Sequence, residues 1–183
     1  MKRPSRSFQI ALSGIACAVV ALALTLACYV DFLMAAGYLL AVFALMVPLS
    51  KQFIWGEVLA FIGGVLLAFL FGGLAFIMNL LPFIVFFGLH PLANHLQRRF
   101  VKHKLVHLPV FLLKAAWFDG AILLIWFTLG GVLGFEGASW YSLVSRYLYL
   151  VVFVGGTLVF FVYDILIFFC QVSVDKIVAR IRR

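Results

Sequence analysis

Four ionisable side chains interrupt stretches of sequence that are otherwise apolar: Glu57, Lys114, Asp119 and Asp164. Charged groups are costly in apolar surroundings, so these residues are candidates for function, and each needs a partner. Lys114 and Asp119 lie five residues apart, which on a helix turns their side chains about 140° away from each other. We therefore do not expect these two residues to pair.

The four residues differ in the interaction partners that the sequence offers them. Lys114 can pair with Glu57 or Asp164 in a polar network between helices, or it can extend its charged end to water. Asp119 must find a hydrogen-bond partner, stay protonated or face a cavity. For Asp119, a structural role and a cavity-lining role both remain open.

The sequence contains no motif of a known catalytic or metal site. A phosphate-binding glycine loop, HExxH, CxxC and a nucleophile elbow are all missing from it. Cys17, Cys28 and Cys170 are isolated and read as packing residues. His103 and His107 have the spacing of a metal clasp but no acidic or cysteine partner nearby, which favours a basic interfacial loop. We expect no enzymatic activity, no cofactor and no metal.

The elements that carry these residues follow from the composition. The chain has 183 residues, of which 67% are hydrophobic and 11% charged, and this is too much apolar surface for one water-soluble core. Crossing a bilayer takes about 20 mostly apolar residues as a helix. We predict an all-α integral membrane bundle, a single domain over 1–183, with six transmembrane helices. The predicted spans are 8–29, 32–49, 53–71, 74–89, 109–133 and 143–169, of which the second and fourth are short.

Lysine and arginine set the predicted orientation, because basic residues near span ends stay in the cytoplasm. They cluster in four segments that fall on one side of the six spans, so both termini are expected to be cytoplasmic. The first span is too long for a signal peptide. The net charge of +8 then reflects topology, with no nucleic-acid partner. We expect a multi-pass protein of a bacterial plasma membrane. Arg146 alone is a basic residue near the opposite face. The basic residues of the four segments are Lys2, Arg3, Arg6, Lys51, Arg98, Arg99, Lys102, Lys104, Lys176, Arg180, Arg182 and Arg183.

Two further segments have patterns that predict contacts. In the first span, small residues share a face, namely Gly14, Cys17, Ala18 and Ala21. Small residues let helix backbones approach closely, either within this bundle or against another membrane subunit. The tail, 172–183, alternates apolar and basic residues at helical spacing, and we expect it to lie on the inner leaflet or to contact a cytoplasmic partner.

Aromatic and charged residues gather near the outer face, in "GFEGASWYSLVSRYLYL". They are Glu136, Trp140, Tyr141, Arg146 and Tyr147. Aromatic residues at this depth are typical of an interfacial belt. Rings beside an acid and an arginine are also what a pocket for a flat polar ligand needs. Both interpretations remain open.

Four phrases together resemble a known group of proteins: "IALSGIACAVVALAL", "FFGLHPLANHL", "LLKAAWFDGAILL" and "VFFVYDILI". They are similar to the substrate-binding (S) components of energy-coupling factor (ECF) transporters, or to an uncharacterised six-span bacterial family like them. Asp119 stands where these relatives carry an asparagine, and His90 where they carry a tyrosine.

The resemblance implies a subunit that binds a vitamin or similar micronutrient from outside. Such a subunit docks on a transmembrane coupling subunit that two cytoplasmic ATPases drive. The small residues of the first span would face the coupling subunit, and the ligand would lie near 140–147. The candidate substrate-binding residues are then Asp119, Glu136, Trp140, Tyr141, Arg146 and Tyr147.

Two other classes of function are consistent with parts of the sequence. A non-transporting membrane scaffold of the cell-shape type shares the size and the number of spans. An intramembrane enzyme would need Asp119 and Asp164 close together. Their predicted depths differ, since Asp119 lies near the midplane and Asp164 in the inner half.

Overall fold

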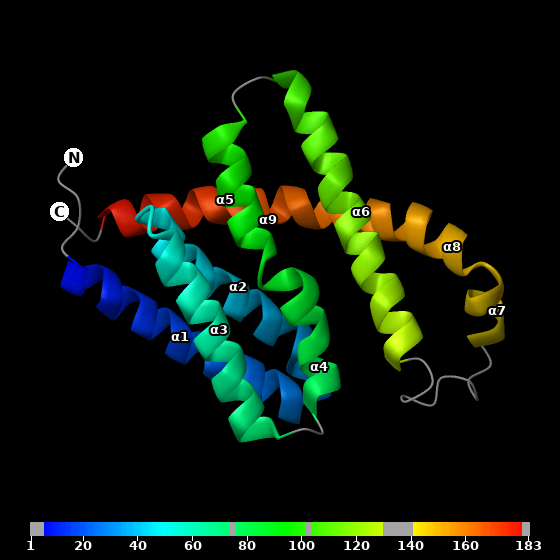
Figure 1. Ribbon diagram of the computed structural model, residues 1–183, viewed down its shortest axis with the longest axis horizontal. Helices are drawn as coiled ribbons and strands as arrows, with labels where there is room; N and C mark the ends of the chain where they lie inside the picture. Colours follow the sequence, from blue (N-terminus) through cyan, green and yellow to red (C-terminus); the bar gives the residue numbers. More distant parts are fainter. Residues whose placement is uncertain (1–5, 74–75, 102–103, 130–140, 181–183) are drawn as a thin grey trace. The chain divides into compact units, whose positions relative to one another are not determined.

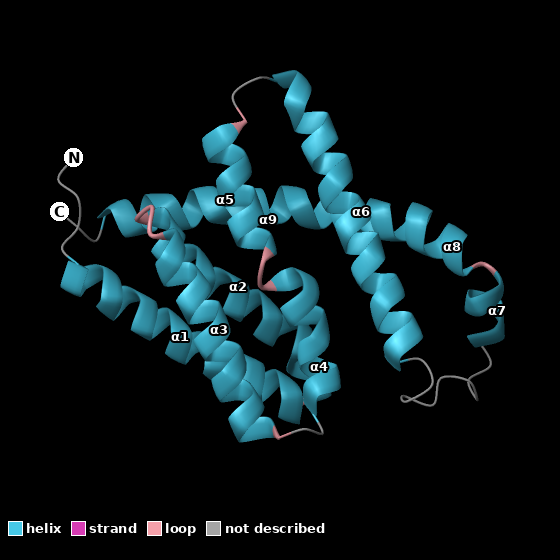
Figure 2. Cartoon of the chain, in the orientation of Figure 1, coloured by secondary structure: helices cyan, strands magenta, loops and turns pink. Residues whose placement is uncertain are grey.

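The computed structural model describes residues 6–73, 76–101, 104–129 and 141–180. Every element in these ranges is helical (Figures 1 and 2), which confirms the predicted all-α class. The contacts within the chain form two compact units. Unit 1 comprises Met1–Arg98 and Ile167–Arg183, and unit 2 comprises Arg99–Leu166.

Most of the described residues lie in long apolar helical stretches. Within the described residues, five helical stretches are able to cross a membrane by length and composition: Arg6–Tyr29, Ile54–Gly72, Ile77–Phe100, Val106–Thr128 and Leu148–Arg180. A further apolar helix, Met34–Ser50, has 17 residues. It would be about 26 Å long at about 1.5 Å per residue, slightly less than the roughly 30 Å of a hydrocarbon core. These helices indicate a multi-pass membrane protein.

Unit 1 is built around its first helix. Helix α1 (Arg6–Tyr29) packs against both α2 (Met34–Ser50) and α3 (Ile54–Gly72), and the 3₁₀ turn η1 (Asp31–Leu33) precedes α2. A Cβ atom on Gly64 of α3 would lie 2.5 Å from Val20 Cγ1, so only glycine fits there. Lipid is as apolar as leucine, and close packing of this kind therefore holds helices together in a membrane.

The next helical stretch of unit 1 is divided into three parts. These are α4 (Ile77–Pro82), the π-helical η3 (Phe83–Phe87) and α5 (His90–Phe100). The predicted span ended at residue 89, whereas the structure continues into α5. Pro91 is the second residue of α5, where its missing N–H removes no helical hydrogen bond. The residues that follow it are mostly good helix formers, so the helix propagates.

Unit 2 pairs one long helix with a returning stretch. The long helix is α6 (Lys104–Leu129). The short helix α7 (Tyr141–Arg146) precedes the returning stretch, which consists of α8 (Leu148–Leu150), the π-helical η5 (Val151–Gly156) and the start of α9 (Thr157–Arg180). The ring of Phe160 lies 5.4 Å from that of Phe111 and 5.5 Å from that of Phe118. Since Phe111 and Phe118 are two turns apart on α6, Phe160 fixes the level at which α6 and α9 pack.

Helix α9 continues without a break through the described part of the predicted tail, and its last turns belong to unit 1. Lys51 Nζ donates a hydrogen bond to the carbonyl oxygen of Val178 over 3.1 Å. Arg98 Nη1 lies 2.9 Å from Asp175 Oδ2. Val178 itself is buried, so protein covers part of the apolar face that the sequence assigned to the inner leaflet. Residues 181–183 of the tail lie outside the described residues.

The close approach of α1 and α3 can be tested with two glycines. We expect Gly64→Ala to lower the free energy of unfolding by about 1–3 kcal/mol, the usual cost of overpacking, because the new Cβ would overlap Val20. Gly14→Ala is the control, since a Cβ at Gly14 meets nothing within 4 Å and alanine is the better helix former. Unfolding in mixed micelles with increasing dodecyl sulfate measures the free energy of unfolding of both variants. Equal effects of the two substitutions would contradict this packing.

Candidate functional site

Lys114 and Asp164 form an ion pair inside unit 2. Lys114 Nζ lies 2.5 Å from Asp164 Oδ1, and the two side chains are 6% and 18% exposed. Of the alternatives that the sequence leaves open for Lys114, the structure shows the pairing with Asp164. Charge-assisted hydrogen bonds of this kind are short and strong. The pair therefore connects α6 to α9 at a defined register.

Asp119 has a different partner on the same returning stretch. Its Oδ2 accepts a hydrogen bond of 3.0 Å from Thr157 Oγ1, and the residue is 3% exposed. Its Oδ1 is buried and has no hydrogen-bond partner within the described residues. A Cβ on Gly156 would lie 2.7 Å from that oxygen. The carboxylate thus fits against η5 only because Gly156 has no side chain.

An aromatic stack lies along the same helix. The rings of Trp126 and Tyr141 are 5.3 Å apart and inclined by only 8°. Trp126 follows Asp119 by seven residues on α6, so the two share a face and lie about 10 Å apart along the axis. Trp126 was not predicted from the sequence: its spacing of two helical turns from Asp119 places the two on one face, but tryptophan is ordinary in an apolar span.

The other residues predicted near the outer face are only partly described. Arg146 lies over the ring of Tyr147, with its guanidinium carbon 5.7 Å from the ring centre. Both side chains are exposed. Glu136 and Trp140 lie outside the described residues. Among the predicted ligand residues that the structure describes, Tyr141 is the one that contacts the face of α6 carrying Asp119, through its stack on Trp126.

Unit 1 has its own buried polar groups, of which Glu57 was predicted from the sequence and the others were not. Glu57 is fully buried in the first turn of α3, where the helix dipole favours a negative charge. Neither of its carboxylate oxygens has a hydrogen-bond partner among the residues that are described. Gln171 of α9 donates to the carbonyl oxygen of Pro91 over 3.5 Å. His90, Asn94 and His95 of α5 are buried as well.

The small-residue face of α1 divides into two parts. Ala21 is buried, and Cys17 packs against α3, because its Sγ lies 2.9 Å from where a Cβ on Gly63 would be. Gly14 and Ala18 are exposed. Packing within unit 1 therefore accounts for Cys17 and Ala21, whereas Gly14 and Ala18 are free to contact another molecule.

Comparison with known proteins finds no matching family model, no matching curated protein and no matching solved structure.

A double-mutant cycle measures how strongly Lys114 and Asp164 are coupled. We expect Lys114→Met or Asp164→Leu alone to cost about 3 kcal/mol of unfolding free energy, since each removes one side of a buried charge-assisted contact. The double variant should lose less than the sum, with a coupling of about 2 kcal/mol. The same cycle on Arg98 and Asp175, which are 34% and 35% exposed, should give less than about 1 kcal/mol. Additive losses at Lys114 and Asp164 would contradict the pairing.

Neighbouring glycines test the position of Asp119. We expect Gly156→Ala to destabilise the protein by about 1–3 kcal/mol, because its Cβ would overlap Asp119 Oδ1. Gly155→Ala is the matched control, since a Cβ there meets nothing within 4 Å. Adding Asp119→Ala should remove most of the loss caused by Gly156→Ala. If it does not, the carboxylate does not lie against η5.

Proposed function

We propose that this chain is the substrate-binding subunit of an ECF-type importer, and that it captures a vitamin or similar micronutrient from outside the cell. The proposal rests first on the resemblance of its four sequence phrases to S components. It rests second on the chemistry along α6, where a carboxylate and an aromatic stack share one face.

One observation carries the proposal furthest. One carboxylate oxygen of Asp119, Oδ2, accepts a hydrogen bond from Thr157. The other, Oδ1, has no hydrogen-bond partner in the described part of the chain. Two turns further along that face, Trp126 stacks on Tyr141. A carboxylate oxygen suits a cationic or N–H donating group of a solute, and stacked rings suit a flat one. Vitamins with a ring and a basic nitrogen have both features.

Access to Asp119 would require η5 to move. In the conformation described, Gly156 packs against the free oxygen of Asp119. Segment η5 is π-helical and contains two consecutive glycines, Gly155 and Gly156. π-Helical turns often occur at functional sites, and glycine lowers the barrier to backbone rearrangement. We infer that η5 opens to admit the solute and closes over it.

The proposed topology has six crossings with both ends in the cytoplasm. Several basic residues of unit 1 support it. Lys51 contacts the end of α9, and Arg98 pairs with Asp175 close to that end. Basic residues collected at one end of a bundle indicate the cytoplasmic side. Gly14 and Ala18 would face the coupling subunit, and energy would come from its two ATPases.

Co-purification tests this function directly. The full chain is purified in lipid nanodiscs from cells that express their native transporters. Mass spectrometry of the denatured sample then identifies any bound solute, and calorimetry measures its affinity. We expect one solute per chain and recovery of a coupling subunit with an ATPase pair. Asp119→Asn should weaken binding about tenfold or more, because it keeps an acceptor for Thr157 but removes the charge.

The control is Asp175→Asn, which removes a carboxylate from unit 1 and should leave solute affinity unchanged. If neither a solute nor an ATPase pair is recovered across several lipids and detergents, the importer proposal fails. A non-transporting scaffold would then be the better explanation.

A further inference from the structure

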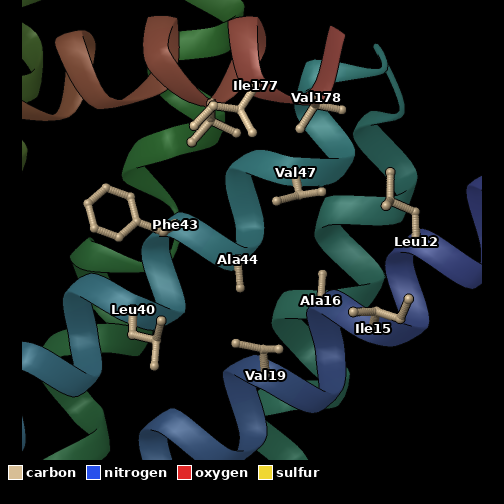
Figure 3. Close-up of a pocket in the computed structure, with 11 residues that line it drawn as sticks. Leu12, Ile15, Ala16, Val19, Leu40, Phe43, Ala44, Val47, Ile177 and Val178 are labelled. Carbon is tan, nitrogen blue, oxygen red and sulfur yellow. The ribbon is translucent and has the colours of Figure 1, made fainter. Parts of the chain in front are cut away.

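A wholly apolar groove lies in unit 1 between α1, α2 and the end of α9 (Figure 3). Its volume is about 360 Å³. Ala16 of α1 and Ala44 of α2 form part of its wall, and Ile177 and Val178 of α9 line it at one end. All of its lining residues are apolar, so its occupant must be hydrocarbon.

The groove is open along its side. Ile15, Leu40 and Ile177 line it and are 64%, 50% and 58% exposed. Helix α1 is long and apolar enough to cross a membrane, and α2 is a shorter apolar helix beside it. The medium at the open side is therefore lipid. A helix about 10 Å in diameter and three turns long occupies on the order of 1,000 Å³, so the groove suits a single acyl chain better than a helix of another protein.

Two basic residues, Lys51 and Arg180, lie near the end of the groove that α9 lines. Lys51 follows the lining residue Val47 by one turn, and its Nζ donates to the carbonyl oxygen of Val178. An ammonium group has three donors, and the structure pairs that of Lys51 with no carboxylate among the described residues. Arg180 is exposed and follows Ile177 by three residues, which places it on the same side of α9. Basic pockets beside membrane helices attract anionic lipid headgroups.

We propose that the groove binds one anionic phospholipid, with an acyl chain between α1 and α2 and the phosphate at Lys51 and Arg180. The lipid would hold the end of α9 against α1 and α2, and would make the packing of this end depend on the lipid composition of the membrane. This binding site is separate from the proposed solute site and does not depend on it.

Native mass spectrometry tests the headgroup preference. The full chain is released from nanodiscs that contain equal amounts of phosphatidylglycerol and phosphatidylcholine with identical acyl chains. We expect one phosphatidylglycerol to remain bound after the other lipids dissociate. Lys51→Gln and Arg180→Gln should each reduce its preference over phosphatidylcholine about fivefold. Arg99→Gln, which removes an exposed charge on α5, is the control and should have no such effect.

A second pair of variants tests the acyl chain. Val19 lines the groove, whereas Leu22 lies one turn further along α1, outside the lining, and is 63% exposed. We expect Val19→Phe to abolish retention of the lipid and Leu22→Phe to leave it unchanged. Leu40→Trp provides a second obstruction at a half-exposed position, in case Val19→Phe does not fold.

Three results would overturn the proposal. One is equal retention of the two phospholipids with no effect of Lys51→Gln or Arg180→Gln. Another is lipid retention that survives both Val19→Phe and Leu40→Trp. The third is a lipid-free dimer that Val19→Phe dissociates, because a second copy of the chain would then fill the groove.

Discussion

A charged side chain within an apolar helix must find a partner on another helix, and this requirement determines how α6 and α9 pack. Lys114 pairs with Asp164, and Asp119 accepts a hydrogen bond from Thr157. The two contacts lie five residues apart on α6 and seven apart on α9. A slip of one residue along either helix would break both contacts. Unit 2 therefore has a single register, and its aromatic rings interlock around that register.

Small residues perform the corresponding task in unit 1. Lipid and leucine are equally apolar, so helices gain little from simply burying apolar surface against each other. The gain comes from close contact, which Gly64 permits between α3 and Val20 of α1. Gly156 also lacks a side chain, and this lets η5 approach the carboxylate of Asp119 closely. The apolar groove lies where α1 and α2 do not close completely.

Much of the helical architecture could be predicted from the sequence, since long apolar runs broken by charge or proline are strong signals. The ends of the helices were predicted less accurately than their presence. Helix α5 was missed because its polar composition resembles a surface loop, although Pro91 stands where a helix tolerates proline. The π-helical segments leave no periodic signal that distinguishes them from α-helix. Trp126 was overlooked because tryptophan in an apolar span is ordinary until its neighbour Tyr141 is known.

By itself, the sequence determined that the chain is helical and belongs in a membrane, because its composition leaves too much apolar surface for water. It also determined that Lys114 and Asp119 do not pair with each other, since their spacing on one helix is a matter of local geometry. Only the tertiary structure decided that Lys114 pairs with Asp164 and that Asp119 accepts a hydrogen bond from Thr157 and packs against Gly156. It also decided that α1, α2 and α9 leave a groove between them. These outcomes depend on which residues meet across helices distant in sequence, and that depends on the packing of the whole unit.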